Sequence, residues 1–343
     1  MNVDMPYDAL RAYEYPGAEP VDFDAFWQTS LDEAAQHPLD LRVEPVSTEF
    51  PVLSVWDVTF SGFGGHPIKA WLKRPVAASG DLPLVVEYVG YGSGRGDVLD
   101  NTFWALAGFA HLVMDVRGQG ANGMPGDTPD PVGSGPAFPG SMTRGILDPH
   151  DYYYRRVYID AARAVDAARR LPGVDPTRVA VAGGSQGGAQ ALAAAGLCRD
   201  LAGVVAFVPF LSAFERALEI TDVHPYAEIS RYLRVRRGDV AQVHRTLAYV
   251  DTVHHARRAT APALYSTALA DSTCPPSTVF ASFRAYGGDK RIEVWPYNGH
   301  EGGGYDDLRL AARFLAPLLR GEPVDAGGSA EVVLRREPLE AAD

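Results

Sequence analysis

The sequence predicts an α/β fold with a mostly parallel central sheet and helices on both of its faces. Short runs rich in valine, leucine and alanine alternate along the chain with stretches of helical periodicity, which is typical of such sheets. The runs lack polar–apolar alternation, so we expect the strands to be buried on both faces. The expected strands cover residues 82–90, 110–118, 178–184, 202–210, 261–271 and 291–300.

An N-terminal arm and a hairpin are predicted ahead of these strands. Residues 1–40 alternate aromatic and acidic residues, and a helix is expected near residues 22–36. "VWDVTF" at 55–60 and "IKAWLKRP" at 68–75 flank the turn-forming "SGFGGHP". Two such runs around a glycine-rich turn indicate a β-hairpin.

Three longer segments lie between the expected strands. Residues 155–171 carry an apolar stripe of helical period that stops at a Pro-Gly pair, so a helix is expected there. Residues 119–154 are rich in glycine and proline, and residues 211–258 are mainly helical in pattern. The last two segments follow strand ends, where open α/β sheets build their binding sites.

Composition limits the choice of partners. The 343 residues carry a formal charge of −12, which disfavours nucleic acid and anionic membranes as partners, since both attract clustered Lys and Arg. Two cysteines are too few for a disulfide framework, and neither an apolar leader nor a membrane span is visible. We expect a cytoplasmic protein with one domain over 1–322, a helical insertion at 211–258 and a polar C-terminal tail over 323–343.

The segment Gly183-Gly184-Ser185-Gln186-Gly187 fits the pattern G-x-S-x-G between an expected strand and an alanine-rich helix. This context predicts a nucleophile elbow, in which a tight turn exposes the serine hydroxyl above the sheet. The helix N-terminus adds positive potential where an oxyanion would form. Ser185 is therefore the candidate nucleophile.

A serine hydroxyl needs a general base, and nine histidines compete for that role. His300 closes the last expected strand, and the flexible Glu-Gly-Gly-Gly that follows could hold its imidazole over the sheet edge. His254 and His255 lie in an arginine-flanked helical segment and are expected at the surface. His300 is therefore the candidate base.

Asp271 ends the strand "ALYSTALAD" and is the candidate that orients the histidine. The chain order Ser185, Asp271, His300 is that of the α/β-hydrolase fold. The rival Asp115 precedes the serine, which is the wrong order, and Arg117 two residues later offers it an ion-pair partner. Asp115 is therefore expected to be structural.

Two backbone N–H groups are expected to stabilise an oxyanion. One belongs to Gln186, after the nucleophile, and the other to Tyr91 in the loop "GYGSGRG" that follows an early strand. Tyr91, with Pro209 and Phe210 of "VPFLSAF", is expected to wall a small acyl pocket. The pattern indicates neither a metal site nor a phosphate or dinucleotide loop, so no cofactor is expected.

Together these segments resemble the acetyl xylan esterase/cephalosporin C deacetylase family of carbohydrate esterases. The resemblance runs from about residue 5 to residue 320 and rests on "GYGSGRG", "MDVRGQG", "GSMTRGILDPHDYYYRR", "GGSQGG", "VPFLSAFERA", "TDVHPYAEI", "DSTCPPSTVFASF" and "YNGHEGGG". It implies an α/β-hydrolase fold and removal of O-acetyl groups from small substrates, such as xylooligosaccharides and cephalosporin-type antibiotics. It also implies a doughnut-shaped hexamer whose active sites face an inner cavity.

The family's nucleophile, acid and base fall on Ser185, Asp271 and His300, and its oxyanion donors fall on Tyr91 and Gln186. Three positions depart from the family pattern and bear on the shape of the acyl pocket. Val89 stands where histidine is common, and Ser212 and Ala213 stand where Cys and Asp are common.

Two other functions are compatible with the fold. A serine peptidase of the prolyl-oligopeptidase type shares the elbow, but the residues ahead of the first core strand are too few for its propeller domain. A noncatalytic binding protein on this fold would be expected to lack a member of the triad, whereas Ser185, Asp271 and His300 are all present.

Overall fold

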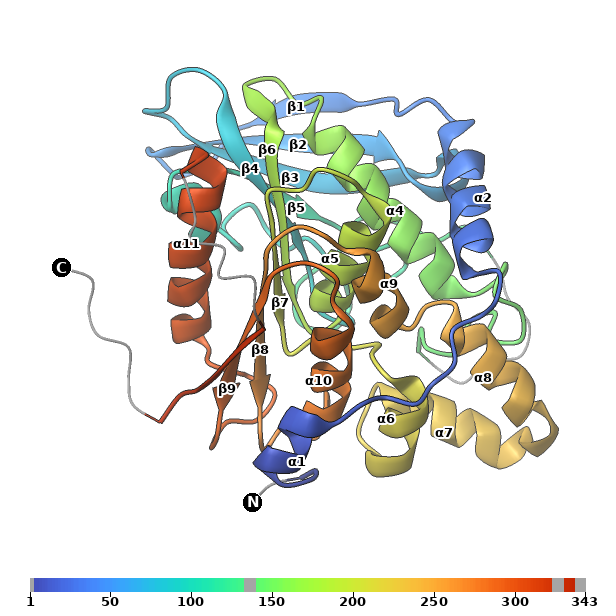
Figure 1. The fold of residues 1–343 in the computed structure, drawn as a ribbon. Coiled ribbons are helices and arrows are strands. Elements are labelled where there is room, and N and C mark those ends of the chain that lie inside the picture. The colour runs from blue at the N-terminus through green and yellow to red at the C-terminus, as the bar shows by residue number, and fades with distance from the viewer. Residues whose placement is uncertain (1–2, 133–139, 323–329, 337–343) are drawn as a thin grey trace.

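This computed structural model describes residues 3–132, 140–322 and 330–336. A mixed β-sheet forms the centre of this part of the chain (Figure 1). Its ten strands are β1 (Arg42–Val46), β2 (Leu53–Ser61), β3 (Pro67–Pro75), β4 (Leu82–Tyr88), β5 (Ala110–Met114), β6 (Val174–Gly184), β7 (Gly203–Phe207), β8 (Ala263–Ala268), β9 (Lys290–Trp295) and β10 (Glu331–Leu334). They lie in the order β1-β2-β3-β5-β4-β6-β7-β8-β9-β10. The α/β fold predicted from the sequence is confirmed.

The pairing separates an antiparallel edge from a parallel body. β1, β2, β3 and β5 pair antiparallel in that order, and every pairing from β5 to β10 is parallel. The six strands predicted within residues 82–300 are all present. β5 and β8 are buried along their whole length, because helices cover both of their faces.

The predicted hairpin is also present, as β2 and β3 joined by the short turn η1 (Phe63–Gly65). The structure adds two strands that the sequence did not predict, β1 and β10. Both are short edge strands whose residues are exposed or half-buried, so they lack the continuous apolar run that marks the other strands. Residues 323–329 and 337–343 of the predicted tail lie outside the described residues.

Two sets of helices cover the sheet (Figure 1). α3 (Phe103–Leu106) and α11 (Tyr305–Arg320) pack on one face. α4 (Tyr153–Ala168), α5 (Gln186–Leu197) and α10 (Pro276–Ala285) pack on the other, where α9 (Thr252–Arg258) lies against α5 and α10. The helix predicted at 155–171 corresponds to α4, and its apolar side is buried against the sheet.

The helical pattern predicted for residues 211–258 is confirmed. The chain between β7 and β8 forms α6 (Phe214–Ile220), α7 (Tyr226–Val235), the turn η2 (Arg237–Asp239), α8 (Val240–Ala248) and α9. α6, α7 and α8 gather at the lower edge of the view in Figure 1, where β8 and β9 end. Their outer side is basic, with four exposed arginines: Arg231, Arg234, Arg236 and Arg237.

The prediction that His254 and His255 lie at the surface is wrong. Both are buried on α9 beneath the N-terminal arm, whose helices are α1 (Tyr7–Ala12) and α2 (Phe23–Ala35). The Phe23 ring lies 5.7 Å from the imidazole of His254 and 5.1 Å from that of His255, between ring centroids. Burial lowers the pKa of both imidazoles. Because α2 lies far from α9 in the sequence, the residues next to His254 and His255 do not indicate that α2 buries them.

None of the helices in the described part of the chain combines the length and the apolar character needed to cross a membrane.

Candidate active site

Ser185 stands on a sharp turn between β6 and α5. Its backbone angles are φ +55° and ψ −118°, which is a strained conformation for a residue with a side chain. The Ser185 N–H donates to the carbonyl of Phe207 at 2.9 Å, and the Ser185 carbonyl accepts from the N–H of Phe210 at 3.0 Å. Hydrogen bonds to the end of β7 thus hold the serine in the geometry of a nucleophile elbow.

The turn also requires glycine at position 187. A Cβ atom at Gly187 would lie 2.1 Å from the carbonyl oxygen of Tyr88, whereas one at Gly184 would come no closer than 3.9 Å to any atom. We expect Gly187→Ala to lower the free energy of unfolding by roughly 2 kcal/mol or more, because α5 would be forced away from β4. The matched control Gly184→Ala should lower it by less than about 1 kcal/mol. Urea unfolding measures both, and equal losses would contradict this close approach.

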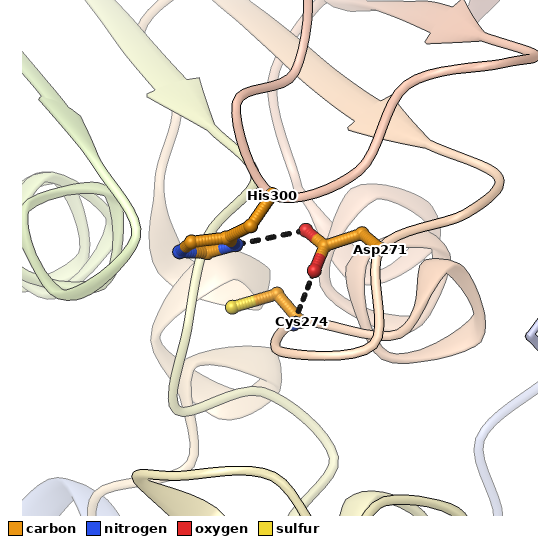
Figure 2. A group of neighbouring side chains, drawn as sticks. All are labelled: Asp271, Cys274 and His300. Atoms are coloured by element: carbon orange, nitrogen blue, oxygen red, sulfur yellow. Dashed lines mark hydrogen bonds and ion pairs between the residues drawn. The ribbon is translucent and has the colours of Figure 1, made fainter.

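Asp271 and His300 meet at the ends of β8 and β9. His300 Nδ1 lies 2.9 Å from Asp271 Oδ2 (Figure 2). The other oxygen, Oδ1, accepts the N–H groups of Thr273 at 2.8 Å and Cys274 at 2.9 Å. The carboxylate is wholly buried, so these donors fix its orientation. Because it holds the imidazole through Nδ1, the Nε2 atom is left for a second partner.

Ser185 and His300 line one open pocket of about 260 Å³. The remaining walls are mostly apolar, with Phe207, Val208 and Leu308 among them, and Asp307 also lines the pocket. Residues at or after the ends of β6, β7 and β9 therefore converge here, as expected where parallel strands end at one edge of a sheet.

Cys274 completes a cluster with Asp271 and His300 that has the residue types of a metal site. The possible ligand atoms of the three side chains lie within 4.8 Å of one another. Burial and the nearby Asp271 carboxylate raise the pKa of the Cys274 thiol well above its ordinary value, so the thiol keeps its proton beside the Ser185 hydroxyl. Both Asp271 oxygens already accept N–H donors. This donor set fits a hydrogen-bonded triad better than a metal centre, which needs a thiolate.

Gln119 joins the two segments that carry the expected oxyanion donors. Its Oε1 accepts the N–H of Gly92 at 2.6 Å, next to Tyr91, and its Nε2 donates to Gln186 Oε1 at 2.9 Å. Within the described residues, the N–H groups of Tyr91 and Gln186 themselves have no acceptor. Gln119 was not among the predicted site residues, and its only signal in the sequence was a polar residue after a buried strand.

The Tyr91 side chain is held by the helical insertion. Its hydroxyl donates to Glu228 Oε1 of α7 at 2.6 Å and accepts the N–H of Ser141 at 2.7 Å. Burial and the hydrogen bond to Glu228 raise the pKa of this hydroxyl, so it stays protonated. Glu228 was also missed by sequence reasoning, because the two partners are 137 residues apart.

Phe210 and Pro209 lie behind the pocket surface. The Phe210 side chain is wholly buried, with its ring centroid 6.5 Å from that of Tyr91 and 4.4 Å from that of Tyr226. Pro209 is buried against Gly188 at the start of α5. Both residues therefore bear on the pocket through the packing behind Tyr91 and Ser185. The three positions that depart from the family pattern are buried as well: Val89, Ser212 and Ala213.

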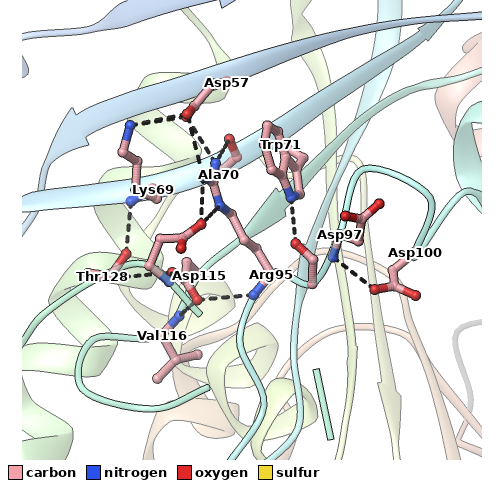
Figure 3. Close-up of polar contacts among 12 residues, drawn as sticks. Asp57, Lys69, Ala70, Trp71, Arg95, Asp97, Asp100, Asp115, Val116 and Thr128 are labelled. Carbon is pink, nitrogen blue, oxygen red and sulfur yellow. Dashed lines mark hydrogen bonds and ion pairs between the residues drawn. The ribbon is translucent and has the colours of Figure 1, made fainter. Parts of the chain in front are cut away.

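Asp115 lies away from Asp271 and His300. It follows β5, which β4, β6 and β7 separate from β8 in the sheet. Its wholly buried carboxylate accepts four backbone N–H groups (Figure 3). These belong to Arg95 at 3.0 Å, Val116 at 3.0 Å, Asp127 at 2.6 Å and Thr128 at 2.8 Å. Asp115 thus ties the loop that carries Tyr91 to the segment after β5.

The predicted ion pair between Asp115 and Arg117 is wrong. Arg117 donates to both carboxylate oxygens of Asp160 on α4, at 2.6 and 2.8 Å, and lies 3.4 Å from Asp130. The reason is that backbone donors already occupy Asp115, and the Arg117 side chain turns toward α4.

Comparison with known proteins supports one family. A family model described as acetyl xylan esterase (AXE1) matches residues 1–316. The acetyl esterase Axe7A of Xylanibacter ruminicola is 30% identical over 285 residues, which are 82% of this chain and 63% of that protein. This chain therefore spans less than two thirds of that relative.

Two solved structures resemble the fold over nearly all of their own length. The acetyl xylan esterase from Paenibacillus sp. R4 has a TM-score of 0.86 and 39% identity, covering 91% of this chain and 99% of that one. Acetyl xylan esterase 1 from Thermoanaerobacterium sp. JW/SL YS485 has a TM-score of 0.85 and 34% identity, covering 92% of this chain and 99% of that one.

Proposed function

This chain belongs to the acetyl xylan esterase (AXE1) family of carboxylic ester hydrolases, and from that premise we propose that it removes O-acetyl groups from small molecules. The proposed substrates are acetylated xylooligosaccharides and cephalosporin-type esters, in keeping with the family resemblance. The observation that carries the proposal is the 2.9 Å contact of His300 with Asp271 at a pocket that Ser185 shares.

In the proposed first step, His300 Nε2 takes the proton of Ser185 as Oγ attacks the acetyl carbonyl carbon. The N–H groups of Tyr91 and Gln186 donate to the oxyanion that forms. Because Gln119 already links the two segments that carry these N–H groups, the backbone need not rearrange as the charge develops. Asp271 remains ionised and stabilises the imidazolium through Nδ1.

The second step completes the cycle. His300 gives its proton to the departing alcohol oxygen as the tetrahedral intermediate collapses to an acetyl-serine. Water then loses a proton to His300 and attacks the acetyl carbonyl. Collapse of this second intermediate returns the proton to Ser185 Oγ and releases acetic acid.

One assay separates this proposal from the two alternatives. The purified protein is mixed with p-nitrophenyl acetate and, separately, with an aminoacyl-proline p-nitroanilide. We expect hydrolysis of the ester and none of the anilide. Hydrolysis of the anilide would favour a peptidase, and a lack of turnover of either compound would favour a binding protein.

Acyl selectivity should be narrow, because we propose that the Tyr91 side chain forms a rigid wall of the acyl pocket. Two hydrogen bonds fix the Tyr91 hydroxyl, and the Phe210 ring packs against the Tyr91 ring. A longer acyl chain would therefore have to displace packed side chains. We expect rates on p-nitrophenyl esters to fall steeply from acetate to propionate to butyrate.

Two variants at this wall sharpen the measurement. Tyr91→Ala keeps the backbone N–H but widens the pocket, so the ratio of butyrate to acetate hydrolysis should rise. Tyr91→Phe keeps the ring and serves as the matched control, with a ratio close to that of the wild type. Faster hydrolysis of butyrate than of acetate by the wild type would contradict the small pocket.

The family resemblance also leads us to propose a homo-oligomer, with a hexamer as the expected form. In support, the insertion of α6–α8 exposes apolar side chains next to its arginines, including Val235 at 82% and Val240 at 41% exposed. Light scattering should give several times the chain mass of 36.9 kDa, and a monomer at micromolar concentration would contradict it.

We also propose a cytoplasmic location. In support, Cys198 and Cys274 are both free thiols, and a reducing compartment keeps thiols in that state.

A further inference from the structure

Asp307 is a buried carboxylate at the active-site pocket that the proposed mechanism does not use. It is the third residue of α11, and only 4% of it is exposed. Its carboxylate accepts three hydrogen bonds from three parts of the chain. Ser266 on β8 donates at 2.8 Å, Trp295 Nε1 at the end of β9 at 2.9 Å, and the N–H of Gly303 at 2.8 Å.

Two of these donors bracket the loop that carries His300. Trp295 is the last residue before the loop of residues 296–304, and Gly303 lies three residues after His300. The contacts around Asp307 are close. A Cβ atom at Gly303 would lie 2.2 Å from the Trp295 ring, and one at Gly302 would lie 2.9 Å from Asp307 Oδ2. The Asp307 carboxylate therefore fastens both ends of the loop to each other and to β8.

Glu293 on β9 is a charged group that raises the pKa of Asp307. Glu293 is itself paired with Arg291 at 2.6 Å and Arg335 at 2.5 Å. His300 and Glu301 belong to the loop itself and line the same pocket as Asp307. Its neighbours Ser266, Trp295 and Gly303 are neutral, so they stabilise the ionised form through hydrogen bonds and not through an opposite charge.

Burial raises the pKa of Asp307 to about 6, against the three hydrogen bonds that lower it. The carboxylate is thus ionised at neutral pH and takes up a proton under mildly acidic conditions. Hydrogen bonds to an ionised acceptor are about twice as strong as those to a neutral one. Protonation of Asp307 would therefore weaken its hold on Trp295 and Gly303.

We propose that Asp307 is a positioning residue for His300, which holds the His300 loop in its active geometry while ionised and loosens it when protonated. This proposal rests on the proposed role of His300 as the general base. The enzyme then loses activity below neutral pH through two protonations, one on His300 and one on Asp307. An enzyme with a neutral residue at position 307 should lose activity through a single protonation, the one on His300.

Stability should respond in the opposite sense from activity. A carboxyl whose pKa is higher in the folded than in the unfolded chain binds its proton more tightly when folded, so stability falls as pH rises from about 4 through about 6. Acidification across this window thus favours the fold at Asp307 while it lowers the rate. Asp307→Asn cannot take up this proton, so the urea midpoint should change less between pH 5 and pH 7 in the variant than in the wild type.

The test compares Asp307→Asn with Asp306→Asn, which removes the same charge from the same helical turn. Asp306 is half-buried and pairs with the exposed Arg309 at 2.6 Å. Kinetics with p-nitrophenyl acetate are measured from pH 5 to pH 8. At pH 7, Asp307→Asn should lower kcat by about 10- to 100-fold with little change in KM, the range that a small misplacement of a reacting group causes. Asp306→Asn should behave like the wild type.

The pH profile is the readout that a purely structural role would not move. The logarithm of kcat/KM should fall on the acid side with a slope approaching two in the wild type and with a slope of one in Asp307→Asn. Ser266→Ala is a second variant, which removes a donor that favours the ionised form. Its acid limb should shift to higher pH.

Tryptophan fluorescence follows Asp307 without catalysis, because Trp295 is one of its donors. A fluorescence change near pH 6 is expected in the wild type and should be lost in Asp307→Asn. An active wild type whose kcat and pH profile are shared by Asp307→Asn would overturn the positioning role. Failure of the proposed function is a separate result, seen as a wild type that does not hydrolyse the ester at all.

Discussion

Replacing Ser185 by alanine should lower kcat for ester hydrolysis on the order of 10⁴-fold or more. In the proposed mechanism this hydroxyl forms the covalent bond to the acetyl group. One candidate to replace it is the Cys274 thiol, whose pKa is raised by burial and by Asp271, so it is a poor nucleophile there. The change itself removes one oxygen atom and leaves the backbone of the turn as it is.

The measurement is the steady-state rate on p-nitrophenyl acetate, with urea unfolding to show that the variant is folded. Cys274→Ala is the matched control and should retain most of the activity. His300→Ala should fall by a similar factor, and the double variant should fall little further, because the two residues act as a unit. If Ser185→Ala kept a tenth of the wild-type rate, the nucleophile would lie elsewhere.

Asp271→Asn should also reduce kcat by about 10⁴-fold while the fold survives. The asparagine oxygen can still accept the N–H groups of Thr273 and Cys274, which now bond to Oδ1. Its NH₂ group would face His300 Nδ1 and donate to it, which forces the imidazole proton onto Nε2. A histidine in that tautomer cannot take the proton of Ser185.

Asp115→Asn is the matched comparison, since it makes the same change in another buried carboxylate. An amide NH₂ there would confront backbone donors that now point at a carboxylate oxygen. We expect the free energy of unfolding to drop by about 1–3 kcal/mol, with activity per folded molecule largely kept. The reverse pattern, with Asp115→Asn inactive and Asp271→Asn active, would exchange the two assignments.

Most of the fold could be predicted because its strands carry a local signal. Strands buried on both faces are continuous apolar runs, so β4 to β9 were recognisable from their own residues. β1 and β10 were not, since an edge strand that is half exposed has no such run. The turn at Ser185 was also predictable, because the pattern G-x-S-x-G between an apolar run and an alanine-rich helix is a local signal. The clash that requires glycine at position 187 is with Tyr88 on β4, which the local sequence does not show.

The errors share a different cause. His254 and His255 were expected at the surface because their sequence neighbours are arginines, yet α2 from the N-terminal arm buries them. Arg117 was expected to pair with Asp115, its near neighbour in sequence. It instead reaches Asp160 on α4, because backbone N–H groups surround Asp115. In both cases a segment distant in the sequence decided the environment.

The sequence by itself determined which residues form strands and helices, and it placed Ser185, Asp271 and His300 at strand ends in the order of an α/β-hydrolase. These properties depend on periodicity and on local sterics. Only the tertiary structure decided which side chains support them. Gln119 contacts the segments of the proposed oxyanion donors, Glu228 contacts Tyr91, and Asp307 contacts the His300 loop. Such support depends on hydrogen bonds that act over about 3 Å and in set directions. Such partners come together only when the crossover connections bring the strands into their order in the sheet. The periodicity of the sequence does not show which distant residues will then be neighbours.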